Sequence, residues 1–226
     1  MKRLYPNYVW DINTDDKVLY LTFDDGPTPE ITEFVLEQLQ KYRAKATFFC
    51  IGSNVEKYPD IFNQLLAKGH SVGNHTMNHV KGWRFSTNDY LEEVEKAHSA
   101  FQKSLPTGEK FQVINGISKK MQSYTHNKGF NSALFRPPYG QITRSQGENL
   151  NQLGYKVVMW DVLSFDWSSQ VSEEKCLQNV ITKSKSGSVI VFHDSLKASK
   201  NMMYAIPKLL AYFSEKGYRF ESLKIS

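Results

Sequence analysis

The chain has 226 residues, 40% of them hydrophobic and 13% aromatic, which is enough for one domain with a full core and too apolar for a disordered chain. Its net charge of +5 comes without a cluster of lysine and arginine or a nucleic-acid motif, so we interpret it as a solvated surface and expect no nucleic-acid partner. No apolar run approaches the roughly 18–20 residues of a membrane span, and the two cysteines have no metal or redox spacing.

The first residues have the character of an extension ahead of a single domain. Met1–Trp10 contains no hydrophobic h-region, so the chain as it stands carries no secretion signal. This predicts a cytoplasmic protein, unless a signal has been removed. We place the extension at residues 1–16 and the domain at residues 17–226.

Short apolar strands alternate with amphipathic helices in the rest of the chain. The expected strands are Val18–Phe23, Lys45–Ile51, His70–Asn74, Ala133–Phe135, Tyr155–Trp160 and Ser188–Phe192, with Tyr218–Leu223 closing the chain. The expected helices begin at Thr28-Pro29, Pro59, Ser86 or Thr87, Arg144, Ser172 and about Asn201. Repeated strand–helix units predict an α/β fold whose parallel sheet curls into a barrel.

The alternation lapses between Pro106 and about Asn131. Glycine and asparagine punctuate weakly apolar stretches there, which indicates an inserted loop or hairpin at about residues 106–131. We expect this insertion to form a lid or a groove wall, with Phe111 and Tyr124 available to stack on a ligand ring.

Two adjacent carboxylates, Asp24 and Asp25, directly follow the first strand. Chemistry gathers at the carboxyl edge of parallel α/β sheets. Two neighbouring acids at that edge repel each other and are costly to desolvate, so a purely structural role explains them poorly. A bound cation that holds one acid, while the other acid moves protons, would resolve the conflict.

A second feature is the pair His75 and His79, four residues apart. On a helical turn this spacing places both imidazoles on one face, as a shared metal requires. Adding one carboxylate gives three protein ligands and leaves positions open for water, which is typical of catalytic metal sites. Arg136, Asp166 and His193 also follow expected strand ends, where a barrel would bring them together.

These segments resemble the motifs of a known family in their sequence and in their order. They are Thr22-Phe-Asp-Asp-Gly-Pro27, His75-Thr-Met-Asn-His79, Arg136-Pro-Pro-Tyr-Gly140, Asp166-Trp167 and Val191-Phe-His-Asp194. The chain is similar here to the polysaccharide deacetylases with a NodB homology domain, carbohydrate esterase family 4. The resemblance covers about Lys17 to Glu221, apart from the insertion. It implies a distorted (β/α) barrel and one divalent metal, most often Zn²⁺, with Co²⁺ or another transition ion as alternatives. It also implies an acetylated glycan as substrate, of the chitooligosaccharide or peptidoglycan type.

Residue roles follow from the resemblance, position by position. Asp25, His75 and His79 would hold the metal. Asp24 would take the proton of the attacking water, and Arg136 would keep Asp24 ionised and oriented.

The remaining roles concern the oxyanion, the leaving group and the acetyl pocket. The backbone N–H of Tyr139 would stabilise the developing oxyanion. His193 would protonate the departing amine, with Asp166 raising the pKa of His193. Trp167 and Phe192 would line the acetyl pocket, and Phe192 stands where family members commonly have leucine.

Other functions are compatible with parts of this pattern. The same site could serve an O-acetyl esterase of the acetylxylan type or a deacylase of small amides. A two-histidine-one-carboxylate iron oxygenase shares the ligand set but leaves Arg136 and the pair of Asp166 and His193 without a role. A catalytically silent glycan-binding module is the alternative from another class, and retention of both Asp24 and His193 argues against it.

Overall fold

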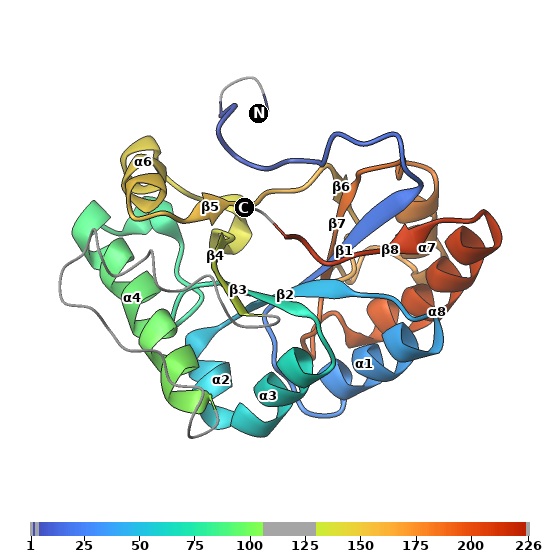
Figure 1. Cartoon of the computed structure of the whole chain (residues 1–226), viewed down its shortest axis with the longest axis horizontal. Helices are drawn as coiled ribbons and strands as arrows, with labels where there is room; N and C mark the ends of the chain where they lie inside the picture. The colour runs from blue at the N-terminus through green and yellow to red at the C-terminus, as the bar shows by residue number, and fades with distance from the viewer. Residues whose placement is uncertain (1, 3–4, 106–129, 225–226) are drawn as a thin grey trace.

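A computed structural model describes residues 2, 5–105 and 130–224 of the chain. Its centre is a curved sheet of parallel strands in the order β5-β4-β3-β2-β1-β7-β6, with β8 paired to the start of β1. Helices cover the outside of this sheet along the lower arc of Figure 1. The expected α/β architecture of a distorted, single-domain (β/α) barrel is confirmed.

The elements alternate as expected. The strands are β1 Val18–Asp24, β2 Ala46–Cys50, β3 Ser71–Asn74, β4 Phe130–Phe135, β5 Lys156–Val157, β6 Val162–Leu163, β7 Val189–His193 and β8 Arg219–Phe220. The helices are α1 Ile31–Lys41, α2 Gly52–Lys57, α3 Pro59–Ala67, α4 Thr87–Ser104, α6 Arg144–Gln152, α7 Glu173–Ile181 and α8 Ser199–Glu215. Two short 3-10 helices, η1 Gly82–Arg84 and η2 Pro138–Gly140, lie in loops.

The parallel register aligns the carboxyl ends of the strands. Asp24, the last residue of β1, pairs with His193 at the end of β7 and with Phe49 of β2. Side chains alternate across each strand, so Phe23 packs outward in the core beneath the helices, whereas Asp24 faces the barrel interior with Arg136. Register and alternation together therefore place the last polar residues of neighbouring strands side by side.

The segment ahead of β1 packs against the barrel. Val9 forms a parallel bridge with Val158, and the Ile12 N–H donates to the Gly187 carbonyl at 2.9 Å. Tyr8 and Trp10 are buried. This segment lies over the gap between β5 and β6, the two ends of the strand order, and crosses the top of Figure 1. Residues that we expected to form an extension therefore help to close the sheet.

Several local expectations differ from the structure. The expected strand Tyr155–Trp160 is reduced to β5, and β6 was not anticipated. Helix α2 was also missed, because its first N–H groups bond to the carbonyls of Thr76 and Met77 from a distant loop. Helix α1 begins only at Ile31, because Glu30 before it has a φ of 66°.

The insertion expected at 106–131, including Phe111 and Tyr124, lies almost entirely outside the described residues. Among the residues that are described, no helix has both the length and the apolar character needed to cross a membrane.

Candidate active site and metal centre

A cavity of about 660 Å³ opens at the carboxyl ends of the strands. It gathers most of the side chains that the sequence singled out. They are Asp24, Asp25, His75, His79, Tyr139, Trp167 and His193. Arg136 and Asp166 do not line the cavity. They are fully buried and pair with two residues that do, Asp24 and His193.

The residues Asp25, His75 and His79 form one cluster at the edge of the cavity. Their ligand atoms lie within 4.8 Å of one another. Oδ1 of Asp25 is 3.2 Å from Nε2 of His79 and 3.8 Å from Nε2 of His75. This oxygen is buried, and it accepts no hydrogen bond from the part of the chain that the structure describes. An unsatisfied buried carboxylate oxygen facing two imidazole nitrogens is suited to a metal ion.

His75 has the protonation state that a metal ligand needs. Its Nδ1–H donates to the backbone carbonyl of Arg136 at 2.7 Å, which leaves the lone pair of Nε2 directed toward Asp25. Burial, together with the nearby His79, lowers the pKa of His75 to about 4. The imidazole is therefore neutral across the physiological range.

The loop that carries His79 is not helical, contrary to our expectation from its spacing. Thr76 and His79 have φ angles of 65° and 54°, in the left-handed region. The loop is held from helix α4, where the carboxylate of Glu93 accepts from the backbone N–H and the side-chain amide of Asn78, both at 3.0 Å. The Met77 N–H donates to the Glu93 carbonyl. Tertiary hydrogen bonds, rather than a helical turn, bring the two imidazoles together.

Asp24 forms a buried ion pair with Arg136. The Asp24 Oδ1 to Arg136 Nη1 distance is 2.8 Å, and neither residue is more than 3% exposed. Burial alone would raise the pKa of Asp24, but the Arg136 guanidinium outweighs it and holds the pKa below its ordinary value. The other guanidinium N–H groups donate to the Val158 and Met159 carbonyls. The site therefore keeps Asp24 ionised and fixed in place.

Beside Asp24, at the end of the adjacent strand β7, His193 is paired with Asp166. The Nδ1–H of His193 donates to Oδ1 of Asp166 at 2.8 Å, and its backbone N–H donates to Oδ2 at 2.7 Å. Burial alone would lower the pKa of His193, but the carboxylate of Asp166 outweighs it and raises the pKa to about 9. His193 is therefore a cation near neutral pH, with Trp167 packed edge-on against its ring.

The structure corrects our placement of Phe192. Its side chain is fully buried, stacks with Phe23 and belongs to the core beneath the helices. The neighbouring residue Val191 points the other way and lines the cavity. Counting back in steps of two from His193 would have found Val191, because side chains alternate along a strand.

Other residues to which the sequence assigned no catalytic or binding role also contribute to the site. Leu163, on the unanticipated strand β6, and Trp160 line the cavity beside Trp167. Asp194 is fully buried and accepts from the Gly26 N–H and the Thr32 hydroxyl, which ties the turn after Asp25 to strand β7.

Comparisons with known proteins agree with this geometry. A family profile described as polysaccharide deacetylase matches residues 11–116. A peptidoglycan-N-acetylglucosamine deacetylase from Bacillus cereus is 33% identical over 97% of this chain and 93% of its own length. A chitooligosaccharide deacetylase from Azorhizobium caulinodans is 31% identical over 86% of this chain and 82% of its own length.

A solved structure of a peptidoglycan N-acetylglucosamine deacetylase, in complex with 4-naphthalen-1-yl-N-oxidanyl-benzamide, superposes with a TM-score of 0.82 at 27% identity. The match covers 99% of this chain and 94% of that one. With a relative above 30% identity aligned over nearly its whole length, and with the expected motifs assembled around one cavity, the chain belongs to the polysaccharide deacetylase family, carbohydrate esterase family 4, with a NodB homology domain.

Proposed function

We propose that the chain is a metal-dependent deacetylase that removes N-acetyl groups from N-acetylglucosamine-containing glycans. The observation that carries this proposal is that one cavity brings together an ionised Asp24, a cationic His193 and the cluster of Asp25, His75 and His79. Relatives named as peptidoglycan and chitin deacetylases support the substrate class.

The donor set fits one divalent transition ion, held by Asp25, His75 and His79. Two neutral imidazole nitrogens and one carboxylate oxygen suit Zn²⁺, with Co²⁺ as an alternative. The buried, unpartnered Oδ1 of Asp25 gains a partner when the ion binds. The ion would polarise the acetyl carbonyl and lower the pKa of a bound water to about 7.

The proton transfers fall to the residues of the chain itself. Asp24, kept ionised by Arg136, accepts the proton of the attacking water. The backbone N–H of Tyr139 donates to the oxygen on which negative charge develops, a contribution of about 3–4 kcal/mol for such donors. His193 then protonates the leaving amine, because an amide nitrogen departs poorly as an anion.

The apolar wall of the cavity is suited to the methyl group of an acetyl substituent. Trp160, Leu163, Trp167 and Val191 line the same cavity as the proposed base and acid. This wall would hold the acetyl group between Asp24 and His193 and exclude water from the side of the methyl group.

The proposal is tested by product analysis with chitooligosaccharides, peptidoglycan fragments and acetylxylan. We expect acetate and free amine in equal amounts from an N-acetylated glycan. Acetate from acetylxylan without amine from the other substrates would instead indicate an O-acetyl esterase. Glycan binding without acetate release from any substrate would indicate a silent binding module and would contradict the proposal.

Substituting Glu93 is expected to weaken metal binding without touching a metal ligand. In Glu93→Gln, an NH₂ group replaces one of the two carboxylate oxygens that accept hydrogen bonds from Asn78. The new amide N–H then faces an N–H of Asn78, and one hydrogen bond that holds the loop before His79 is lost. We expect about 10- to 100-fold weaker metal affinity, as for other partners that orient ligands. Competition with a chromophoric chelator measures this affinity.

Glu92→Gln is the matched control, because Glu92 lies on the same helix with its side chain exposed and paired only with the surface Lys96 among the described residues. Equal metal affinity in Glu93→Gln, Glu92→Gln and wild type would contradict a role for Glu93 in positioning His79.

A further inference from the structure

A large aromatic side chain is exposed on the loop that follows the metal-ligand motif. Trp83 lies in η1 and is 65% exposed, whereas most large aromatic side chains of the described residues are buried or half-buried. Its indole Nε1–H donates to the Ile142 carbonyl at 3.1 Å. This bond anchors the ring by one edge and leaves the broad apolar surface of the indole in contact with water.

The backbone under Trp83 is fixed as well. The N–H of Gly82 donates to the Gln141 carbonyl, and the side-chain amide of Gln146 donates to the carbonyls of Gly82 and Phe85. A Cβ at Gly82 would lie 2.5 Å from the Gln141 oxygen, so the close approach of these loops requires glycine. A rigid, exposed aromatic ring loses little conformational entropy when it binds a ligand, which favours recognition.

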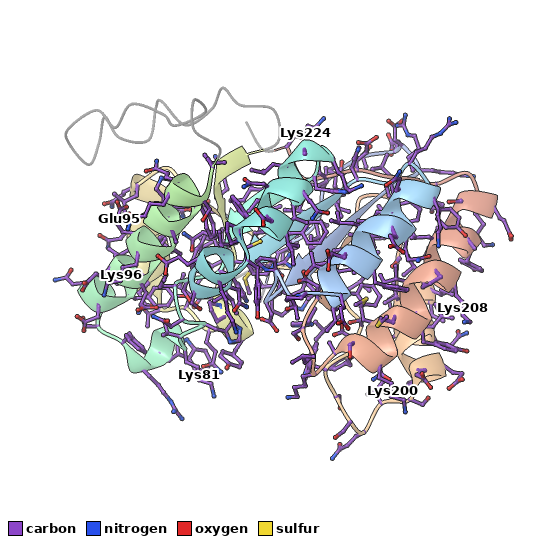
Figure 2. All side chains as sticks on the ribbon, turned by 90° about the horizontal axis from the view of Figure 1, so that it is seen from below. Lys81, Glu95, Lys96, Lys200, Lys208 and Lys224 are labelled. Atoms are coloured by element: carbon purple, nitrogen blue, oxygen red, sulfur yellow. The ribbon has the colours of Figure 1, made fainter. Side chains whose placement is uncertain are left out.

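The loop that carries Trp83 packs against residues next to the cavity: Gln141 and Ile142, which accept its hydrogen bonds, directly follow Gly140 of the cavity lining. Nζ of Lys81 lies 4.7 Å from the ring centroid of Tyr139. Tyr139 lines the cavity, is 55% exposed and packs against the ring of His79. In Figure 2, Lys81 and Lys200 lie on the lower side of the molecule, and Lys224 lies on the upper side. Trp83, two residues after Lys81, therefore lies in a loop that packs beside the cavity-lining segment of Tyr139 and Gly140.

We propose that Trp83, next to the pair of Lys81 and Tyr139, forms a separate sugar-binding position outside the cavity. Its occupant is a neighbouring hexopyranose ring of the same glycan chain whose N-acetyl group enters the cavity. The C–H face of that ring packs on the indole, and the ammonium of Lys81, which lies over the ring of Tyr139, is near enough to bond sugar hydroxyl groups. This inference rests on the proposed function, because the glycan identity of the occupant comes from it.

The first test compares wild type, Trp83→Ala and Trp83→Phe on N-acetylglucosamine oligomers of increasing length. We expect kcat/KM of the wild type to rise with length and that of Trp83→Ala to be about tenfold lower on long oligomers, with no difference on the shortest substrate. Trp83→Phe keeps an aromatic face and should be intermediate. An equal loss at every length, or no loss, would overturn the inference.

The matched control is Tyr42→Ala, which removes an exposed aromatic side chain at the far end of α1. It should leave the length dependence unchanged. The melting temperature should stay near that of wild type in Trp83→Ala, since the indole is mostly exposed. Light scattering tests whether a second copy of the chain covers Trp83 instead of a sugar. If the wild type is a dimer and Trp83→Ala is a monomer, Trp83 belongs to a dimer interface, and the inference is overturned.

The second test measures binding without catalysis, as the retardation of each protein in gels that contain a soluble chitin derivative or peptidoglycan fragments. Trp83-dependent retardation without acetate release would support the sugar position and refute the proposed function. Acetate release with equal retardation of wild type and Trp83→Ala would refute the sugar position alone. Neither retardation nor acetate release would refute both.

Discussion

Replacing Arg136 with methionine is expected to lower the free energy of unfolding by about 3–5 kcal/mol. The guanidinium is fully buried and pairs with Asp24, so its removal leaves a carboxylate in the interior without its counter-charge. The carbonyls of Val158 and Met159 also lose their N–H partners. Denaturant unfolding of wild type and Arg136→Met measures the difference.

A double variant separates the two contributions to this loss. Asp24→Asn removes the buried charge, so Asp24→Asn/Arg136→Met should be more stable than Arg136→Met alone. Arg144→Met is the surface control, because the side chain of Arg144 is 84% exposed and pairs with Glu148 on the helix surface; it should leave stability unchanged within error. If Arg136→Met were as stable as Arg144→Met, the buried ion pair would not be important for the fold.

Replacing Asp166 with asparagine is expected to move the alkaline limb of the kcat/KM profile to lower pH. His193 must be protonated to act as the acid, and the carboxylate of Asp166 raises the pKa of His193 to about 9. The cationic form is retained below that pH and lost above it, and the positive charge of the proposed metal ion would shift the alkaline limb to lower pH. Without the carboxylate the limb falls further, and kcat/KM at pH 8 should drop by about 100-fold or more.

A substrate with a good leaving group provides the control for this prediction. Aryl acetates release a phenolate that needs no protonation, so Asp166→Asn should lose much less activity on them than on an N-acetyl glycan. An equal loss on both substrates with an unchanged pH profile would contradict the assignment of His193 as the acid. It would instead indicate that Asp166 acts through the fold, where it also accepts the backbone N–H of His193.

The gathering of the proposed metal ligands and of the proposed acid and base around one cavity was predictable, because their segments follow strand ends and parallel strands bring those ends together. Asp24 and His193 are neighbours for this reason alone. The conformation around His79 was not predictable from its spacing. It depends on left-handed backbone angles that Glu93 stabilises from another element, helix α4.

The wall of the cavity was harder to predict than its polar residues. Strand β7 is apolar on both faces, so the sequence from Val189 to Phe192 does not reveal which side chains face the cavity and which face the helices. For this reason Phe192 was assigned to the cavity wall in place of Val191. Strand β6 is only two residues long and gives no periodic signal. The burial of Trp10 depends on a gap in the sheet that becomes visible only when the whole strand order is known.

Acetate release from chitooligosaccharides by wild type and Asp24→Asn, each stripped of metal and then supplied with Zn²⁺ or Co²⁺, tests the proposed mechanism most directly. Asparagine keeps the shape of Asp24 but cannot accept the proton, so we expect metal-dependent release by wild type and a loss of about 10²- to 10⁴-fold in the variant. Equal release by the stripped and reloaded wild type, or full activity of reloaded Asp24→Asn, would contradict a metal-dependent deacetylase with Asp24 as its base.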